Sequence, residues 1–250
     1  MRGRKAAVAS FWKRHTPTIA CFNRAETPLG VDFDALIAAL QAFVDEHVAP
    51  VWGTPARLVK AKGYMRGCWA MGFFDHANHA RRLAYHDLTP EGYPQAKVYV
   101  KTTLDDGKRV SVAASHELVE MLVDPSINLV TMKPGGRLAF GYESADPVED
   151  MSFPVHGIAM TNFVYPSYFE SFHKPGSVKF DHLGTLVKPF QIHAGGYQGV
   201  YTEGKWKQLF SSRSKQKRFE MQDRRGRRHE RRAASHLKKS ARKHLPPAGK

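Results

Sequence analysis

The sequence has few of the features that would assign it quickly to a class. It contains only two cysteines, Cys21 and Cys68, which are too few for a disulfide framework or a cysteine-based zinc site; we expect two buried, reduced thiols. No run approaches the roughly 18 apolar residues that a membrane span requires. The basic start lacks the long apolar core of a secretory signal, and no phosphate-binding G-x-x-x-x-G-K-[ST] motif occurs. These absences favour a cytoplasmic or virion-internal protein.

The chain is nevertheless long enough for a core, and its charge is uneven. Of its 250 residues, 42% are hydrophobic and 11% are aromatic, so most of the chain is expected to fold. Residues 213–250 contain 15 Lys and Arg against three acids, a net +12, so the other 212 residues carry only +3 of the +15 total. We therefore divide the chain into a basic arm (1–16), a folded domain (17–210) and a basic tail (211–250).

Hydrophobic spacing predicts an α+β domain. The apolar segment 18–23 is typical of a strand. Apolar residues recur at helical spacing over 33–48, where Asp34 can cap the start and Pro50 can end the helix. A strand, a helix, several strands and a second helix in this order favour a mixed sheet. The further strands are expected at 68–75, 82–87 and 97–101.

The segment "AASHELVEMLVDP" (residues 113–125) carries the first chemical signal. His116, Glu120 and Asp124 are spaced i, i+4 and i+8, so a helix places them on one face. Buried charged groups are costly unless they are paired or bound to a metal. The pattern therefore indicates either a metal site or an exposed helix face with solvated acids.

A second acidic segment, "YESADPVED", follows a turn expected at residues 134–136. It contains Glu143, Asp146, Glu149 and Asp150. Acids this close repel each other, and a cation would relieve the repulsion. The turn could bring Glu143 back to the helix face that carries the histidine. The alternative is an acidic turn at the surface.

Together, the two segments resemble the active site of the gluzincins, the thermolysin-type zinc peptidases, over about thirty residues. That family has H-E-x-x-H on a helix, a glutamate ligand further along the chain, and an aspartate that hydrogen-bonds the first histidine. In this chain Glu120 stands where the family has its second histidine. Residue by residue, the resemblance implies metal ligands His116, Glu120 and Glu143, the general base Glu117, and Asp146 as the aspartate outside the ligands. The nearby acids Asp124 and Glu149 are, with Asp146, further candidates for outer or alternative ligands.

A longer pattern resembles a group of uncharacterised bacterial and phage proteins. It consists of S-H-E-x-x-E-M-x-x-D-P at 115–125, E-x-x-D-x-V-E at 143–149, and N-F-V-x-P-x-Y-F at 162–169. The similarity extends over roughly residues 18–200. This second resemblance implies no activity.

The gluzincin resemblance implies hydrolysis by a metal-activated water. Three protein ligands leave one position on a zinc ion open for water. The metal lowers the pKa of that water, Glu117 accepts its proton, and the hydroxide attacks a peptide carbonyl. Glu120 adds a negative charge to the ligands, which favours oxygen-preferring metals. We expect a divalent metal, zinc first, with manganese or calcium as alternatives, and an extended peptide substrate along the strand at 97–101.

The basic tail has almost no large apolar side chains and is expected to be disordered or a lone helix. Dense Lys and Arg bind phosphates by releasing counterions, without reading a base sequence. Nucleic acid is therefore the expected partner, and a solubilising tail or an anionic membrane surface are the alternatives. The candidate nucleic-acid-binding residues are Arg224, Arg225, Arg227, Arg228, Arg231, Arg232, Lys238 and Lys239.

The sequence thus favours a zincin-like α+β domain that acts as a metal-dependent peptidase, followed by a nucleic-acid-binding tail. The alternative is a non-enzymatic structural or phage virion-associated protein that binds a structural cation and packaged nucleic acid. No feature of the sequence indicates an oligomeric state.

Overall fold

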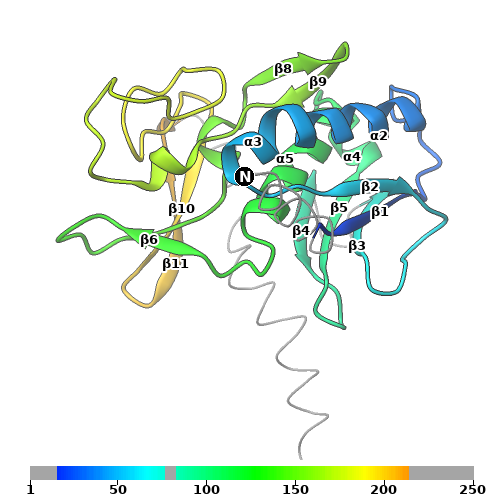
Figure 1. Cartoon of the computed structure of the whole chain (residues 1–250), viewed down its shortest axis with the longest axis horizontal. Coiled ribbons are helices and arrows are strands. Elements are labelled where there is room, and N and C mark those ends of the chain that lie inside the picture. Colours follow the sequence, from blue (N-terminus) through cyan, green and yellow to red (C-terminus); the bar gives the residue numbers. More distant parts are fainter. Residues whose placement is uncertain (1–15, 77–82, 214–250) are drawn as a thin grey trace, which may run out of the picture.

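The computed structural model describes residues 16–76 and 83–213. Within these ranges the chain is α+β, with a five-stranded, a four-stranded and a two-stranded sheet. The two larger sheets lie on opposite sides of helix α5 (Val110–Val123), as Figure 1 shows. The expected basic arm, apart from residue 16, and the eight candidate nucleic-acid-binding residues of the tail lie outside the described residues.

The five-stranded sheet has the order β2-β1-β3-β5-β4. All neighbouring strands are parallel except β4, which runs antiparallel to β5. β1, β3, β4 and β5 match strands predicted from the sequence, although the ends of all but β1 differ. The strands are β1 (Thr18–Asn23), β2 (Arg57–Lys60), β3 (Trp69–Phe74), β4 (Ala84–Leu88) and β5 (Pro94–Tyr99).

The prediction that residues 97–101 form an edge strand open to a peptide substrate is wrong. Strand β5 lies inside the sheet, because it pairs with β3 on one side and β4 on the other. The chain then becomes helical at Val100, where α4 (Val100–Asp105) begins. Among the described residues, the outermost strand on this side is β4.

The first predicted helix is longer than expected and changes its winding. It comprises α2 (Phe33–Ala42), a π-helical turn η1 (Phe43–Val48) and α3 (Ala49–Trp52). The prediction that Pro50 ends the helix is wrong. Pro50 stands in the first turn of α3, directly after the π-helical turn, and proline is tolerated in the first turn of a helix. The helix instead ends at Gly53, whose φ of 68° is the left-handed conformation that favours glycine.

The cap of α2 also differs from the prediction. Asp32 has the extended backbone of a capping residue, and its Oδ1 accepts a hydrogen bond of 2.9 Å from the Ala35 N–H. Asp34, the predicted cap, lies in the first turn of the helix. Its carboxylate pairs with Lys60 of β2 at 2.8 Å.

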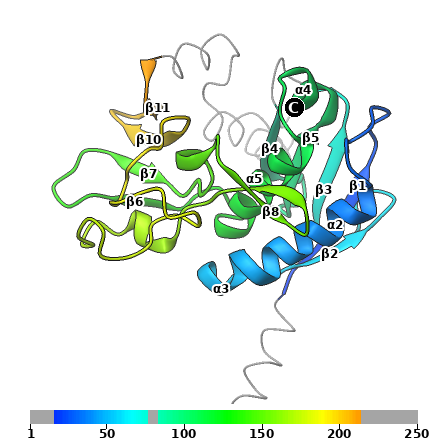
Figure 2. The same cartoon turned by 90° about the horizontal axis from the view of Figure 1, so that it is seen from above.

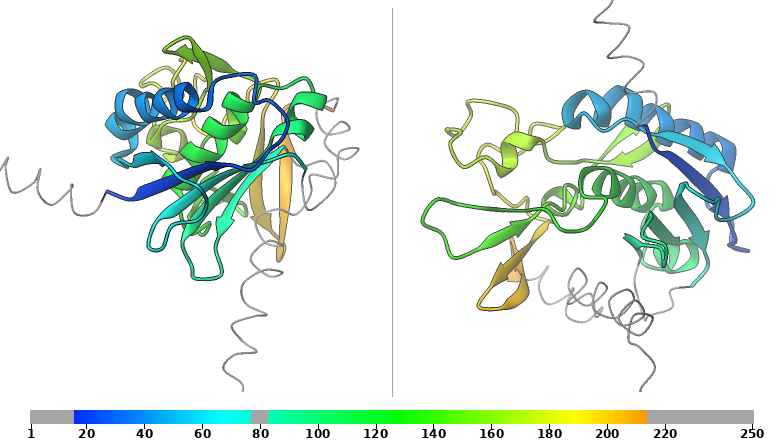
Figure 3. Two further views of the ribbon diagram at one scale, coloured as in Figure 1. Left: turned by 90° about the vertical axis from the view of Figure 1, so that its right-hand side faces the viewer. Right: turned by 60° about the horizontal axis from the view of Figure 1, so that its bottom comes forward.

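One face of the five-stranded sheet packs against α2 and α5, which lie above it in Figure 3. Alternate residues of each strand supply this face, as the twofold repeat of a strand requires. Cys21 is buried in this core and Cys68 is half-buried; both are free thiols. The strand residues in this core include Ile19, Cys21, Met71, Phe73, Ala96 and Val98, which pack with Leu36, Leu40 and Leu118 of the helices.

The four-stranded sheet has the order β11-β10-β7-β6 and is antiparallel throughout. Its β6–β7 hairpin turns at residues 134–136, as predicted. Seen from above in Figure 2, this sheet lies across α5 from the five-stranded sheet. The strands are β6 (Val130–Met132), β7 (Ala139–Gly141), β10 (Tyr197–Thr202) and β11 (Lys205–Phe210), and β8 (Ser152–Val155) pairs with β9 (Ile158–Thr161).

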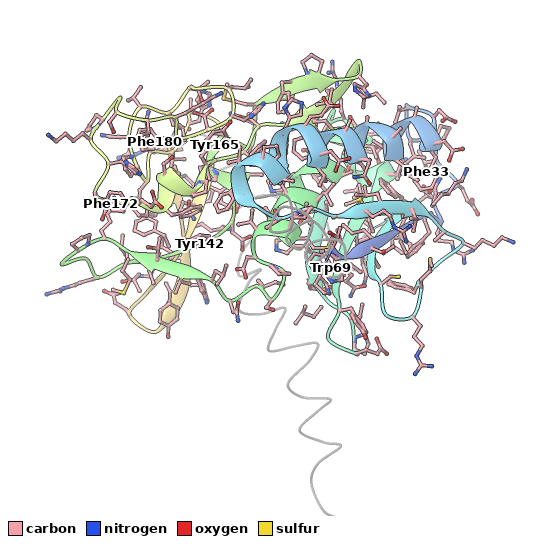
Figure 4. All side chains as sticks on the ribbon, in the orientation of Figure 1. Phe33, Trp69, Tyr142, Tyr165, Phe172 and Phe180 are labelled. Carbon is pink, nitrogen blue, oxygen red and sulfur yellow. The ribbon has the colours of Figure 1, made fainter. Side chains whose placement is uncertain are left out.

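A second core, built from aromatic residues, joins this sheet to the loops after β9. Tyr142 stacks on Phe169 of the short helix η3 (Pro166–Phe169) with ring centroids 4.1 Å apart. Figure 4 shows Tyr142 and Phe180 on this side of the molecule, with Phe172 at its outer margin, where 76% of that residue is exposed. Among the residues described, no helix combines the length and apolarity needed to cross a bilayer.

Candidate metal centre

Helix α5 directs three ionisable side chains into the interior. His116 and Glu120 lie one turn apart, and Glu117 is adjacent to the histidine. Glu117 and Glu120 are buried, and the His116 side chain is only 13% exposed. The helix lies between two sheets, so the alternative of a solvated helix face is wrong.

A second histidine, His86, meets α5 from strand β4. It follows Ala84 by two residues, so both side chains face the helix. His86 is 2% exposed. Its Nδ1 lies 2.9 Å from Glu117 Oε2 and 3.6 Å from Glu120 Oε2, and its Nε2 lies 3.8 Å from Glu143 Oε2. A proton on Nδ1 would be donated to Glu117 and would leave the Nε2 lone pair on the side of Glu143.

These side chains form two groups with the spacing of metal ligands. One consists of His86, Glu120 and Glu143, and the other of His116, Glu120 and Asp146. Within each group, one ligand atom from every residue lies within 4.8 Å of the others. In the second group, His116 Nε2 lies 3.5 Å from Glu120 Oε1 and 3.2 Å from Asp146 Oδ1. The groups share Glu120.

The β6–β7 hairpin returns the chain to α5, as the sequence analysis expected for Glu143. The backbone N–H of Ala145 donates a 3.2 Å hydrogen bond to Glu120 Oε1. The short helix η2 (Asp146–Val148) then begins, and its Pro147 stands in the first turn. Glu143 and Asp146 therefore flank Ala145, whose backbone N–H is hydrogen-bonded to Glu120.

The first residue of β10 and the segment before it contact Asp146 and its neighbour Pro147. Tyr197 donates a hydrogen bond to the Asp146 carboxylate, and the His193 N–H donates one to the Pro147 carbonyl at 2.9 Å. Gly196 approaches the Pro147 carbonyl so closely that a Cβ would overlap it. This close approach requires glycine at position 196.

Electrostatic interactions couple the members of the second group. Burial lowers the pKa of His116, but the charge of Glu120 and a hydrogen bond to Asp146 outweigh burial and raise that pKa well above its ordinary value. Burial raises the pKa of Glu120, but the charge of His116, its hydrogen bond, the charge of His86 and the Ala145 N–H together outweigh burial and lower that pKa to about 2. Burial and the Glu120 charge raise the pKa of Asp146 to about 6. Protons bound here would compete with a metal ion for the same ligand atoms.

The predicted ligands His116, Glu120 and Glu143 all lie at this centre, but divided between the two groups. Glu117, the predicted base, contacts His86. Asp146, predicted as an outer or alternative ligand, belongs to the second group. Neither group contains Asp124 or Glu149. Asp124 instead accepts hydrogen bonds from the backbone N–H groups of Asn128 (2.9 Å) and Leu129 (3.0 Å), in the turn that ends α5.

Sequence reasoning missed His86 and Tyr197. His86 lies in a predicted strand, and its alternation with Ala84 was a usable signal, because it places a histidine on an apolar face. Tyr197 follows two glycines in a segment that is typical of a turn, and no sequence signal indicates its partner. No family model, curated protein or solved structure matches the chain, so the interpretation depends on the geometry of the centre itself.

Proposed function

We propose that the chain is a metal-dependent hydrolase that cleaves peptide bonds, centred on the group of His86, Glu120 and Glu143. The observation that carries this proposal is the 2.9 Å contact of Glu117 with His86. It places a carboxylate outside the group beside one of its ligands. A carboxylate in that position can accept a proton from a water molecule held at the group.

Within this proposal, each residue has a role. His86, Glu120 and Glu143 would hold a divalent cation, which when bound lowers the pKa of water and polarises a carbonyl. Glu117 would take the proton from that water and pass it to the leaving amine. Because Glu120 brings negative charge, manganese and calcium are candidates beside zinc.

A zincin-like fold is part of the proposal. Two features support it: the His-Glu helix packs against β4 and β5 of a mixed sheet, and further acids return from a hairpin. The proposed peptide-binding edge is β4 rather than β5. The Tyr99 N–H donates to the Leu83 carbonyl. Alternate residues of an antiparallel strand hydrogen-bond to its neighbour, so the backbone groups of Ala84, His86 and Leu88 point away from β5. An extended peptide would lie along that edge.

The second candidate function is a structural cation site in a non-enzymatic, virion-associated protein. The observation that favours it is burial, because His86, Glu120 and Glu143 are each at most 7% exposed. Structural metal sites are closed, whereas catalytic sites keep a position open to substrate. In this case the cation would stabilise the fold without turnover.

The basic tail remains a proposed nucleic-acid-binding segment in either function. Its support is the +12 charge on residues 213–250. Binding through this segment would depend on phosphate charge rather than on base sequence.

The test uses untagged full-length protein, stripped with a chelator and reloaded with Zn²⁺, Mn²⁺ or Ca²⁺. Peptide-library digestion followed by mass spectrometry measures cleavage, and thermal unfolding measures stability. Cleavage that the chelator removes and a metal restores supports the hydrolase. A metal-dependent rise in Tm with no cleavage under any metal rejects it and favours the structural alternative.

A further inference from the structure

The two carboxylate oxygens of Glu120 face two different histidines. Oε1 lies 3.5 Å from His116 Nε2, and Oε2 lies 3.6 Å from His86 Nδ1. The Ala145 N–H also donates to Oε1, so the carboxylate is held with one oxygen toward each group. Glu120 is thus the carboxylate that the two groups share, with Oε1 toward the histidine of one group and Oε2 toward the imidazole ring of the other.

The group that the proposed function leaves unused has the dimensions of a metal site. Ligand atoms about 2.1 Å from one ion lie roughly 3.0–3.4 Å apart in tetrahedral or octahedral geometry. His116 Nε2 lies 3.2 Å from Asp146 Oδ1 and 3.5 Å from Glu120 Oε1. One histidine and two carboxylates, on a helix and on a segment braced against it, therefore stand at nearly coordinating separations.

Charge also favours two cations over one. Glu117, Glu120, Glu143 and Asp146 are all buried around the two histidines. When ionised, these four carboxylates carry −4, which two divalent cations match with +4 and one cation leaves at −2. Buried charge without compensation is costly.

We propose that the centre binds two divalent cations bridged by Glu120, the second held by His116, Glu120 and Asp146. The position of the first ion rests on the proposed function, but occupancy of the second group does not require catalysis. Two-metal sites place their ions about 3.5–4 Å apart, a separation that one bridging carboxylate spans. Tyr197 acts as a positioning residue, because its hydrogen bond orients the Asp146 carboxylate.

The experiment is a titration of untagged, metal-free, full-length protein with Mn²⁺, read by bound stoichiometry and by electron paramagnetic resonance. We expect two equivalents per chain and an exchange-coupled spectrum. Asp146→Asn and Glu143→Gln should each remove one equivalent and the coupling. The control Asp150→Asn changes a partly exposed acid that belongs to neither group and pairs with Lys108 at 3.2 Å, and it should keep both equivalents.

Tyr197→Phe provides a milder variant should Asp146→Asn fail to fold. It keeps every ligand and should weaken only the second equivalent, by about 10–100-fold. One equivalent in the wild type would overturn the proposal, as would two equivalents with uncoupled spectra or with no response to the Asp146 and Tyr197 changes. Two coupled equivalents without peptide cleavage would support the bridged pair and reject only the hydrolase. Peptide cleavage with one bound equivalent would support the hydrolase and reject the bridged pair.

Discussion

His86 Nδ1 lies 2.9 Å from Glu117 Oε2, and this buried contact joins the edge strand β4 to helix α5. The two residues are 31 positions apart in the chain. The contact gives Glu117 two conceivable roles, as a proton acceptor or as the group that orients the His86 ring. The two roles predict different behaviour when the carboxylate is replaced by an amide.

Glu117→Gln should reduce peptide hydrolysis by about 10²–10⁴-fold and leave metal content unchanged, because glutamine keeps the shape but accepts protons poorly. Turnover and metal affinity are measured on the same preparation. Hydrolysis equal to that of the wild type would remove Glu117 as the base. A 10–100-fold loss of metal affinity would instead identify it as an orienting residue.

Glu143→Gln should weaken metal binding at the group of His86, Glu120 and Glu143 by at least 10-fold, because a charged ligand is lost. Calorimetric titration with Zn²⁺ measures the change. Glu149→Gln is the matched control, since Glu149 is a neighbouring acid that belongs to neither group. Equal losses in both variants would mean that general charge, rather than coordination, holds the cation.

Deleting residues 213–250 removes +12 of the +15 charge. Affinity for DNA or RNA should collapse, while Tm and metal content of the remainder should barely change. Titration of labelled DNA at several salt concentrations measures affinity, which in the full chain should fall steeply with salt. Tight binding by the truncated chain would move the nucleic-acid site to the folded domain or the basic arm.

Stability should decrease in mild acid because of His182. Burial and the charges of His47 and Lys179 lower the pKa of His182 from 6.5 to about 4, although the charge of Asp181 acts in the opposite direction. Between these pH values the unfolded chain takes up a proton that the folded chain does not. The contribution of His182 is therefore complete above pH 6.5 and is lost as the pH falls toward 4.

Urea unfolding at several pH values, in the wild type and in His182→Phe, measures this effect. The phenylalanine can pack on Phe163, on which the His182 ring stacks with centroids 5.1 Å apart. The variant loses the 3.1 Å contact with Tyr165, which changes its stability at every pH. The two proteins are therefore compared by how steeply their free energy of unfolding changes with pH. The variant should lose less stability on acidification, and equal slopes would contradict the prediction.

Much of the fold follows from local pattern. β1 matches its predicted bounds because its apolar run is short and clearly bounded, and α5 forms where the His-Glu motif was predicted to be helical. The helix was predicted to end at Pro50, but it continues to Trp52. Rules based on a single sequence assume α-helical winding and do not anticipate the π turn that precedes the proline.

The centre was only partly predictable, for a different reason. Spacing on one helix could join His116 to Glu120, but it could not reveal His86, which reaches α5 only through the register of β4 on β5. Likewise, Asp124 lies one turn beyond Glu120, yet its carboxylate accepts hydrogen bonds from backbone N–H groups in the turn after the helix. The sequence shows which side chains could bind a metal, whereas the tertiary fold determines which of them lie close together.

The centre joins segments that are far apart in the chain. His86 and Glu143 are separated by 57 positions, and they belong to the edge of one sheet and to the segment that follows a hairpin of the other. A cation bound between them, as proposed, would act as a reversible cross-link that closes a long loop. Because its ligands come together only in the folded chain, the cation would be released on unfolding, so resistance to unfolding and to proteolysis would rise with free metal concentration.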